Sequence, residues 1–385
     1  MSVPSSVPVR RRRTGYLAFF LSGICAISSG VVVSVLQEHY ALPYGLTGTL
    51  LSCMSTGNLL AAFLAGVLPG KIGLKKTILL LGTGYCVGYA MMGLGGWALL
   101  LAAAFFLVGL AKGSVLNVCT ILVGDNTPER TRGTNTMHSF YACGALLCPF
   151  LVTVALRGGD LAPMFVLSAL GALLWLTFAA APVGSASEKK AGGQTNWSFL
   201  RSSRFWLLTA LLFCQNGAET SVTGWLVTYF KDCGILSAAI SPYTVTVLWG
   251  VTMVMRLVLA FVFPPKNAYR AMVWMGLGCS IFYCGLMLTK SQVPALLLLA
   301  LFSLSIAGMN PTAVAAAGRM TSVTSMGVML PAAGLGAIVM PWLIGLVAEH
   351  SGIAAGMAVN LTPCVGMLVF ALLVKQTAKK EKVMA

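Results

Sequence analysis

The sequence predicts an all-α membrane protein with twelve transmembrane helices arranged as two parallel six-helix repeats. The prediction depends on an apolar composition, twelve apolar runs of spanning length and a one-sided distribution of positive charge. Of the 385 residues, 58% are hydrophobic and only 9% are charged, and the mean hydropathy is +0.88. Soluble globular proteins carry about 25% charged residues, so lipid is the solvent for most of this chain.

The apolar runs predict helices of membrane-spanning length. A helix that crosses the hydrocarbon core needs about 20 mostly apolar residues. Because lipid offers the backbone no hydrogen-bond partners, uninterrupted runs of this length are expected to be helical. The twelve runs are 15–37, 45–69, 77–95, 98–123, 134–156, 162–182, 205–230, 242–264, 270–289, 292–315, 324–348 and 353–375.

Lysine and arginine predict the orientation of these spans. Of the 25 basic residues, 20 lie in segments on the side of the N-terminus and three, Arg157, Lys231 and Lys290, on the other side. Lys112 and Arg256 fall inside spans. Basic residues collect in cytoplasmic loops, so we expect a multi-pass protein of the cell (inner) membrane with both termini in the cytoplasm. The net charge of +16 therefore reflects topology, and nucleic acid is not an expected partner.

A polar segment divides the chain into two halves. Residues 183–204 are rich in glycine, serine and charge, which predicts a flexible cytoplasmic linker. It separates a bundle at 1–182 from a bundle at 205–385, each with six predicted spans.

The two halves resemble each other in sequence. Gly30 in the first span aligns with Gly224 in the seventh, and Gly144 in the fifth aligns with Gly336 in the eleventh. Because each half has an even number of spans, both copies enter the membrane from the same side. This indicates a parallel repeat about an axis along the membrane normal.

The seventh span carries polar residues deep in an apolar run. Gln215, Glu219 and Thr223 are spaced by four, which puts them on one helix face. A carboxylate at the bilayer centre costs roughly 2.5–3.5 kcal/mol on insertion scales, so it indicates a wet cavity or a partner. Lys112 in the fourth span is expected at a similar depth. A Lys112–Glu219 pair would be either a coupling pair, broken by substrate or a proton, or a structural pair that joins the halves.

Four other residues inside the spans are candidates for function. Arg256 is expected to have a gating or structural role in preference to a contact with the substrate, which is the alternative. Trp225 could stack on a sugar ring, and Asn310 with Pro311 predicts a locally broken helix at a cavity. His138 is a candidate for the gating region, either as a proton relay or as a packing residue. The spans hold one deep acid and two bases, which argues weakly for an anionic group on the substrate.

The segment between the second and third spans resembles a motif of the major facilitator superfamily. Gly66-VLPGKIGLKK is similar to that family's Gly-x-Leu-x-Asp-Arg-x-Gly-Arg-Lys loop, and Lys71 fits the pattern. Gly70 stands where the family has an aspartate that helps to lock the loop. The resemblance implies the major facilitator fold, with Gly70 and Lys71 in the gating region and an altered lock.

Three segments resemble the fucose–galactose–glucose symporter-like branch of that family. They are Gly109-LAKGSVLN, which ends in Asn117, Thr134-NTMHSFYACGALLCPF and Gly217-AETSVTGWLVTYF. The resemblance implies a sugar-like solute and a substrate-binding role for Asn117. Symporters of the fucose type have a proton-binding glutamate four residues before that Asn, and here the position is Gly113. Glu219 is then the leading candidate for carrying a proton.

These observations predict a secondary active transporter for a small polar organic solute, sugar-like or a sugar acid or other organic anion, coupled to H⁺. An exporter of amphiphilic drugs and a non-transporting membrane sensor are the alternatives. The sequence shows no phosphate loop, metal-ligand cluster or nucleophile–base pattern, so we expect no enzymatic activity, cofactor or metal. The expected partners are the solute, H⁺ and the lipid bilayer, with the protein as a monomer.

Overall fold

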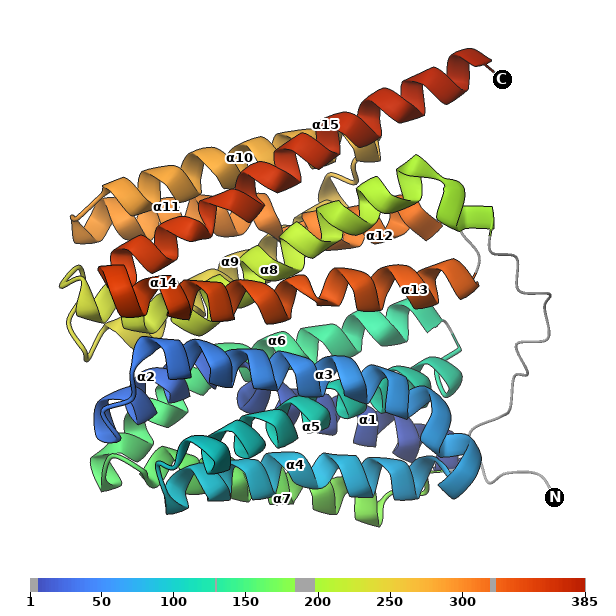
Figure 1. Cartoon of the computed structure of the whole chain (residues 1–385). Helices are drawn as coiled ribbons and strands as arrows, with labels where there is room; N and C mark the ends of the chain where they lie inside the picture. Colours follow the sequence, from blue (N-terminus) through green and yellow to red (C-terminus); the bar gives the residue numbers. More distant parts are fainter. Residues whose placement is uncertain (1–5, 129, 184–197, 319–322, 385) are drawn as a thin grey trace. The chain divides into compact units, whose positions relative to one another are not determined.

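The computed structural model describes residues 6–128, 130–183, 198–318 and 323–384, and these ranges are almost entirely helical (Figure 1). The first half contains α1 (Ser6–Ile27), α2 (Ser29–His39), α3 (Tyr44–Ile72), α4 (Leu74–Leu94), α5 (Ala98–Asp125), α6 (Arg130–Ala155), η1 (Leu156–Gly158) and α7 (Ala162–Ala180). The second half contains η2 (Ser198–Arg201), α8 (Ser203–Asp232), η3 (Ser241–Tyr243), α9 (Thr244–Leu257), the π-helical η4 (Val258–Val262), α10 (Ala268–Leu288), α11 (Gln292–Ala307), α12 (Met309–Gly318), α13 (Val323–Gly334), α14 (Gly336–Val359) and α15 (Leu361–Met384). Since the described ranges contain no strand, the predicted all-α class is confirmed.

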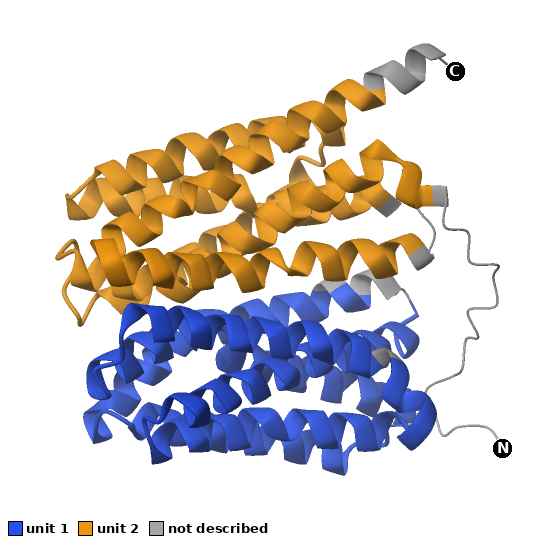
Figure 2. Ribbon diagram, viewed as in Figure 1, with its two compact units in different colours: residues 1–190 blue, residues 191–385 orange. Residues whose placement is uncertain are grey.

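The chain divides into two compact units, unit 1 with residues 1–190 and unit 2 with residues 191–385 (Figure 2). Most of the linker predicted at 183–204 lies outside the described residues, because 184–197 are not among them. The predicted domain limits at 182 and 205 therefore stay predictions.

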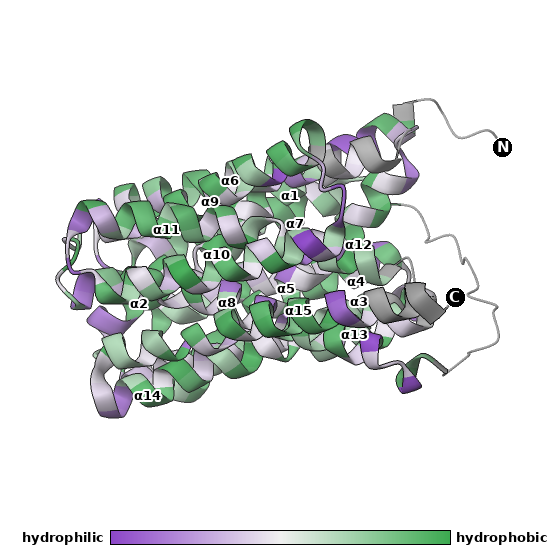
Figure 3. Cartoon of the chain, turned by 90° about the horizontal axis from the view of Figure 1, so that it is seen from above, coloured by the Kyte–Doolittle hydropathy of each residue, from purple (hydrophilic) through white to green (hydrophobic). Residues whose placement is uncertain are grey.

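Nine helices or helix combinations in the described ranges are long and apolar enough to cross a membrane. The predicted set of twelve contains three more spans, and each of the three differs from the nine for a physical reason. Polar residues such as Glu219 lower the hydropathy of α8, and α9 has only 14 residues before it continues as η4. The last apolar stretch, Ser325–Ala378, holds two spans because Gly352 has φ of +82° and breaks the helix there. Figure 3 shows hydrophobic residues along most helices and hydrophilic residues gathered near their ends.

The helix contacts within the two units follow one pattern, as a repeat predicts. In unit 1, α1 packs on α5, α6 and α7, and α4 packs on α5 and α7. In unit 2, α8 packs on α12, α13, α14 and α15, and α10 packs on α11, α12 and α15. The first and seventh spans therefore make equivalent contacts, each with at least three helices of its own unit, and we call them the central helices of the two units.

Glycines at matched positions allow the central helix of each unit to approach its neighbour closely. A Cβ added at Gly144 of α6 would lie 2.1 Å from the carbonyl oxygen of Phe20 in α1. A Cβ added at Gly336 of α14 would lie 2.0 Å from the carbonyl oxygen of Phe213 in α8. The glycine pair that the sequence aligned thus serves the same helix crossing in both units.

The first span of unit 1 is interrupted at Ser28, between α1 and α2. The Ser28 hydroxyl donates to the carbonyl oxygen of Cys25 at 2.7 Å, and the Tyr89 hydroxyl donates to the same oxygen at 2.5 Å. Ser22 and Tyr85 share a further buried hydrogen bond of 2.9 Å. Neutral hydroxyl groups therefore satisfy the backbone at this break.

Candidate functional site

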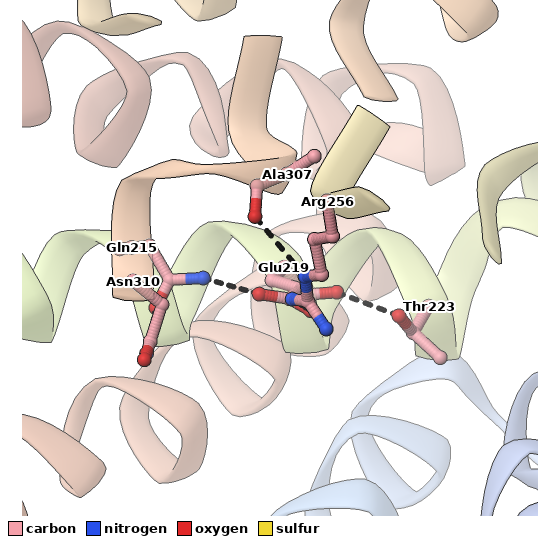
Figure 4. Close-up of polar contacts among 6 residues, drawn as sticks. All are labelled: Gln215, Glu219, Thr223, Arg256, Ala307 and Asn310. Atoms are coloured by element: carbon pink, nitrogen blue, oxygen red, sulfur yellow. Dashed lines mark hydrogen bonds and ion pairs between the residues drawn. The ribbon is translucent and has the colours of Figure 1, made fainter. Parts of the chain in front are cut away.

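The polar stripe on α8 forms a connected set of contacts (Figure 4). Gln215 donates its side-chain amide to Oε2 of Glu219, and the hydroxyl of Thr223 donates to the backbone carbonyl of Glu219 at 2.8 Å. Glu219 is the seventeenth of the 30 residues of α8, so its carboxylate lies near the middle of the helix. Gln215 is completely buried, which fixes the amide beside that carboxylate.

The tenth span is broken beside this stripe, as its Asn-Pro pair predicts. Helix α11 ends at Ala307, and α12 begins at Met309. Pro311 has no N–H, so the carbonyl of Ala307, four residues earlier, lacks its usual helical donor. Asn310 then donates its side-chain amide to Oε1 of Gln215 at 2.7 Å. The break therefore joins α12 to the stripe on α8.

Arg256 from α9 closes the set of contacts. Its Nε donates to the carbonyl oxygen of Ala307 at 3.1 Å, and its Nη2 donates to Oε1 of Glu219 at 3.3 Å (Figure 4). The guanidinium also lies over the ring of Trp249, with Cζ 5.9 Å from the ring centroid. One arginine thus satisfies the carbonyl that Pro311 leaves open and also pairs with the carboxylate.

We call this set the Glu219 network: Gln215, Glu219, Arg256, Asn310 and the carbonyl of Ala307. All its members belong to unit 2. The side chain of Glu219 is 19% exposed and that of Arg256 is 40% exposed, so the ion pair is partly open to its surroundings. A half-open pair of this kind can exchange partners at lower cost than a fully buried one, because each charge keeps some solvation.

A π-helical segment follows Arg256 almost directly. Residues Val258–Val262 form η4, which begins two residues after the arginine, and the N–H of Phe263 donates to the carbonyl of Val258 at 2.8 Å. Such π segments occur mostly as single turns inside α-helices and frequently lie at functional sites. Here the irregular turn lies on the same span as the only base in the Glu219 network.

Lys112, the base that the sequence analysis placed opposite Glu219, lies on α5 of unit 1 and is partly buried. The predicted pair would join the two units and stays a prediction. Within unit 2 the base that pairs with Glu219 is Arg256, which was predicted to have a gating or structural role, with a substrate contact as the alternative. A specific signal could have found it: a proline exposes the carbonyl four residues before it, and a deep arginine is a suitable donor.

Trp225 packs inside unit 2. It is fully buried, and its indole N–H donates to the carbonyl oxygen of Pro341 in α14 at 3.1 Å. Tyr229, one turn later, is also buried and donates to the carbonyl of Leu286 at 3.5 Å. In this structure both rings hold helices together, and stacking of Trp225 on a sugar stays a prediction.

Asn117 and the segment before it make contacts within unit 1. The Asn117 amide donates to the carbonyl of Gly113, one turn earlier in α5, at 2.8 Å. A Cβ at Gly113 would lie 2.6 Å from the carbonyl oxygen of Asn58 and 2.8 Å from Cβ of Ala61. The position where fucose-type symporters have a glutamate therefore has no space for a side chain in this structure.

Of the residues predicted in the gating region, His138 lies in the first half of α6, and Gly70 and Lys71 lie at the end of α3. His138 is exposed on α6 and meets the ring of Phe19 edge-on, with centroids 5.3 Å apart. Gly70 and Lys71 were expected in a loop, but α3 continues through them to Ile72. A Cβ at Gly70 would meet nothing within 4 Å, and Lys71 is exposed. Their gating role stays a prediction.

The basic end of the same motif has a defined contact. The chain turns at Gly73, where φ is +85°, and Lys75 follows in the first turn of α4. Lys75 Nζ donates to the carbonyls of Ala179 and Ala181 at 2.7 and 3.1 Å. A cation there stabilises the C-terminal end of α7, whose last carbonyls have no helical donors.

Comparison with curated proteins gives distant relatives. The chain is 23% identical over 239 residues to the probable sulfoacetate transporter SauU of Cupriavidus necator, covering 56% of this chain and 55% of that protein. It is 23% identical over 150 residues to a protein TsgA homolog of Yersinia pestis, covering 38% of each. The chain thus spans about half or less of the length of the curated relatives it matches.

Comparison with solved structures shows the fold over nearly the whole chain. The D-xylose-proton symporter matches with a TM-score of 0.77 and 15% identity, over 96% of this chain and 97% of its own. The nucleoside transporter NupG matches with a TM-score of 0.72 and 16% identity, over 97% of this chain and 99% of its own. The sequence model of the Major Facilitator Superfamily matches residues 15–330. The chain therefore belongs to the major facilitator superfamily, with the twelve-span fold of that family.

Proposed function

We propose that this protein is a secondary active transporter that moves a small polar organic solute across the membrane by alternating access, with Glu219 carrying the coupled proton. The observation that carries the proposal is the Glu219–Arg256 pair at 3.3 Å, near the middle of the central helix of unit 2. Ionisable residues inside spans mark substrate and proton pathways in membrane proteins.

The contacts of Glu219 give the proposed proton a physical effect. While ionised, the carboxylate accepts from Arg256 and from Gln215. Protonation removes the charge that attracts Arg256, so the hold of α8 on α9 weakens. Gln215 also contacts Asn310, so the same event reaches the break between α11 and α12. One proton can thereby shift the balance between two arrangements of α8, α9 and α12.

The names of similar proteins agree with a small polar solute. They include a probable sulfoacetate transporter, a D-xylose-proton symporter and a nucleoside transporter. We propose Gln215, Asn310 and Thr223 as solute contacts on unit 2, and Lys112 and Asn117 as the corresponding groups on unit 1. We propose transport without catalysis, by a monomer in the cell (inner) membrane. We also propose that both termini lie in the cytoplasm, which the 20 to three distribution of basic residues supports.

The test begins with a thermal-shift screen of the purified protein against sugars, sugar acids and amino acids, since a bound solute stabilises the folded state. Uptake of the best hit into proteoliposomes is then measured with and without an inward proton gradient. We expect Glu219→Gln to remove the stimulation by the gradient. The matched control is Glu349→Gln, which neutralises an exposed acid far along α14 and should leave uptake unchanged. Gradient-driven uptake by Glu219→Gln at the wild-type rate would refute the proposal.

A further inference from the structure

We infer that the solute is an organic anion, a carboxylate or a sulfonate, that takes the place of Glu219 on Arg256. The inference rests on the proposed function and narrows it, because it chooses between the neutral sugar and the anion that the sequence leaves open. It depends on the geometry of Arg256 and on the charges that surround it.

Arg256 is held in one orientation with part of its hydrogen-bonding edge unused. A guanidinium has five N–H groups in a rigid planar fork. Ala307 takes the Nε–H and Glu219 takes one N–H of Nη2, which leaves three N–H groups with no acceptor among the residues that the structure describes. The side chain is 40% exposed, so these groups are not enclosed by packing. An oriented and partly open fork suits an acceptor with two oxygens on one centre.

The charges near Glu219 make an anion the necessary replacement. In the described part of unit 2, two charged or titratable groups interact with Glu219. Arg256 of α9 contacts its carboxylate, and the thiol of Cys279 in α10 interacts with it electrostatically. Asp232 is at the end of α8 and pairs with Lys231 at 3.8 Å. Lys112 of unit 1 is the other base predicted at this depth. No second carboxylate of the described unit 2 contacts the guanidinium.

Protonation of Glu219 therefore leaves Arg256 without its counter-charge. Arginine does not release its proton in proteins, so the guanidinium stays positive. A charge left alone at membrane depth is costly, whereas a paired one is tolerated. A neutral sugar could fill the hydrogen bonds of the fork but would leave the charge uncompensated. A carboxylate or sulfonate supplies both the oxygens and the charge.

The charge balance closes for a monovalent anion. In the empty site the cation Arg256 and the anion Glu219 sum to zero. In the loaded site the carboxyl of Glu219 holds the proton, the solute holds the negative charge and Arg256 is unchanged, so the sum is again zero. Entry of one proton with one monovalent anion thus moves no net charge. We expect uptake of such a solute to be insensitive to membrane potential and to respond to the pH gradient.

The experiment measures equilibrium binding to the purified full-length protein by titration calorimetry. The probes are matched pairs of an anion and a neutral analogue: D-galacturonate with D-galactose, glycolate with glycolamide, and 2-hydroxyethanesulfonate with ethylene glycol. We expect at least one anion to bind at least about tenfold more tightly than its neutral partner, the scale of a charge-assisted contact. Its affinity should rise as the pH falls, because protons remove the competing carboxylate of Glu219.

The variants separate this contact from a general effect on folding. Glu219→Gln should bind the anion with the wild type's low-pH affinity at every pH. Arg256→Lys keeps the charge but loses the fork and should weaken binding at least about tenfold. Lys290→Gln is the matched control and should bind as the wild type does. Lys290 is an exposed base in a segment that we assign to the outer side of the membrane. If Arg256→Lys unfolds, the doubly neutral Glu219→Gln/Arg256→Gln replaces it, and it should bind no anion.

Several results would overturn the inference: equal binding of both members of every pair, pH-independent affinity in the wild type, undiminished binding by Arg256→Lys, or no binding of any anion in the set. Failure of the two proposals looks different. Proton-driven uptake of a neutral solute would reject the anion and keep the proposed function. Anion binding at Arg256 without proton-driven uptake would reject the coupling and keep the anion site.

Discussion

Unit 1 and unit 2 have the same helix pairings but different polar chemistry at the centre. Their central helices cross a neighbour at the matched glycines Gly144 and Gly336. In the register that aligns Gly30 with Gly224, Cys25 in α1 corresponds to Glu219 in α8. Around Cys25 the backbone carbonyl accepts from hydroxyl groups, whereas around Glu219 a carboxylate accepts from a guanidinium. The repeat has kept the packing and changed the charge.

This difference suggests different roles for the two units. Hydroxyl groups such as those of Ser28 and Tyr89 stay neutral across the working pH range, so their hydrogen bonds do not respond to protons. The Glu219–Arg256 pair can lose its attraction when a single proton binds. At this position the contacts of unit 1 are therefore expected to stay the same as the pH changes. In unit 2 the Glu219–Arg256 contact is expected to respond to protonation.

The largest effect is expected from breaking the ion pair. Arg256→Gln leaves Glu219 without its base and the carbonyl of Ala307 without its donor. Loss of one partner of a fully buried pair costs about 3–5 kcal/mol, and because Arg256 is partly exposed we expect about 1–3 kcal/mol here. Solute uptake should be lost. Thermal unfolding in detergent and proteoliposome uptake are the two measurements.

The double variant Glu219→Gln/Arg256→Gln provides the control for that prediction. It removes both charges, so its stability should return at least halfway to the wild-type value while uptake remains lost. If the double variant is as unstable as Arg256→Gln alone, the loss of stability does not come from the unpaired carboxylate.

The second prediction tests whether the two helix crossings are equivalent. Gly144→Leu and Gly336→Leu each place a side chain where a carbonyl oxygen lies within 2.1 Å of the new Cβ. Both should destabilise the protein by about 1–3 kcal/mol, as overpacked interiors do. Gly327→Leu in α13 is the control, because a Cβ there meets nothing within 4 Å. A large loss of stability at one crossing alone would show that the two helix crossings are not equivalent.

The third prediction concerns the break in the tenth span. Pro311→Ala restores an N–H that competes with Arg256 for the carbonyl of Ala307, so α11 and α12 should join into a more regular helix. Uptake should fall several-fold while thermal stability stays equal or rises. Pro331→Ala, inside α13, is the matched control and should leave uptake unchanged. Unchanged uptake in Pro311→Ala would show that the break does not position Arg256.

The smallest effect is expected in unit 1. Tyr89→Phe removes one of the two hydroxyl donors to the carbonyl of Cys25 and leaves Ser28 in place. Hydrogen bonds between helices in membranes are worth about 0.6 kcal/mol on average, and we expect a loss of that order. The dependence of uptake on pH should match that of the wild type. A shifted pH profile would mean that unit 1 also takes part in the response to protons.

The architecture was predictable because it follows from local properties of the chain. Length and apolarity mark the spans, and the side on which basic residues collect predicts their orientation. The aligned pair Gly144 and Gly336 indicated the repeat, because a close crossing needs a glycine wherever it occurs. Even the break at Asn310–Pro311 is local, since proline removes its own N–H. The structure places that break after Ala307.

The partners inside the site were less predictable, because they depend on which helices meet. The stripe of Gln215 and Glu219 was visible from spacing, but the choice of its base was not. Lys112 and Arg256 are both deep bases, and only the packing of α9 beside α8 and α11 puts Arg256 on Glu219. Trp225 shows the same limit, since its indole N–H can donate to a ligand or to a neighbouring carbonyl. In this structure it donates to the carbonyl oxygen of Pro341.

We propose that solute binding transfers one proton to Glu219. The direct measurement is the number of protons taken up per anion bound, from calorimetric titrations of the same anion in buffers of different ionisation enthalpy. At a pH where Glu219 is ionised in the empty protein, the wild type and Glu349→Gln should each take up about one proton per anion, and Glu219→Gln should take up none. Proton uptake by Glu219→Gln equal to that of the wild type, or no uptake by the wild type at any pH, would contradict the claim.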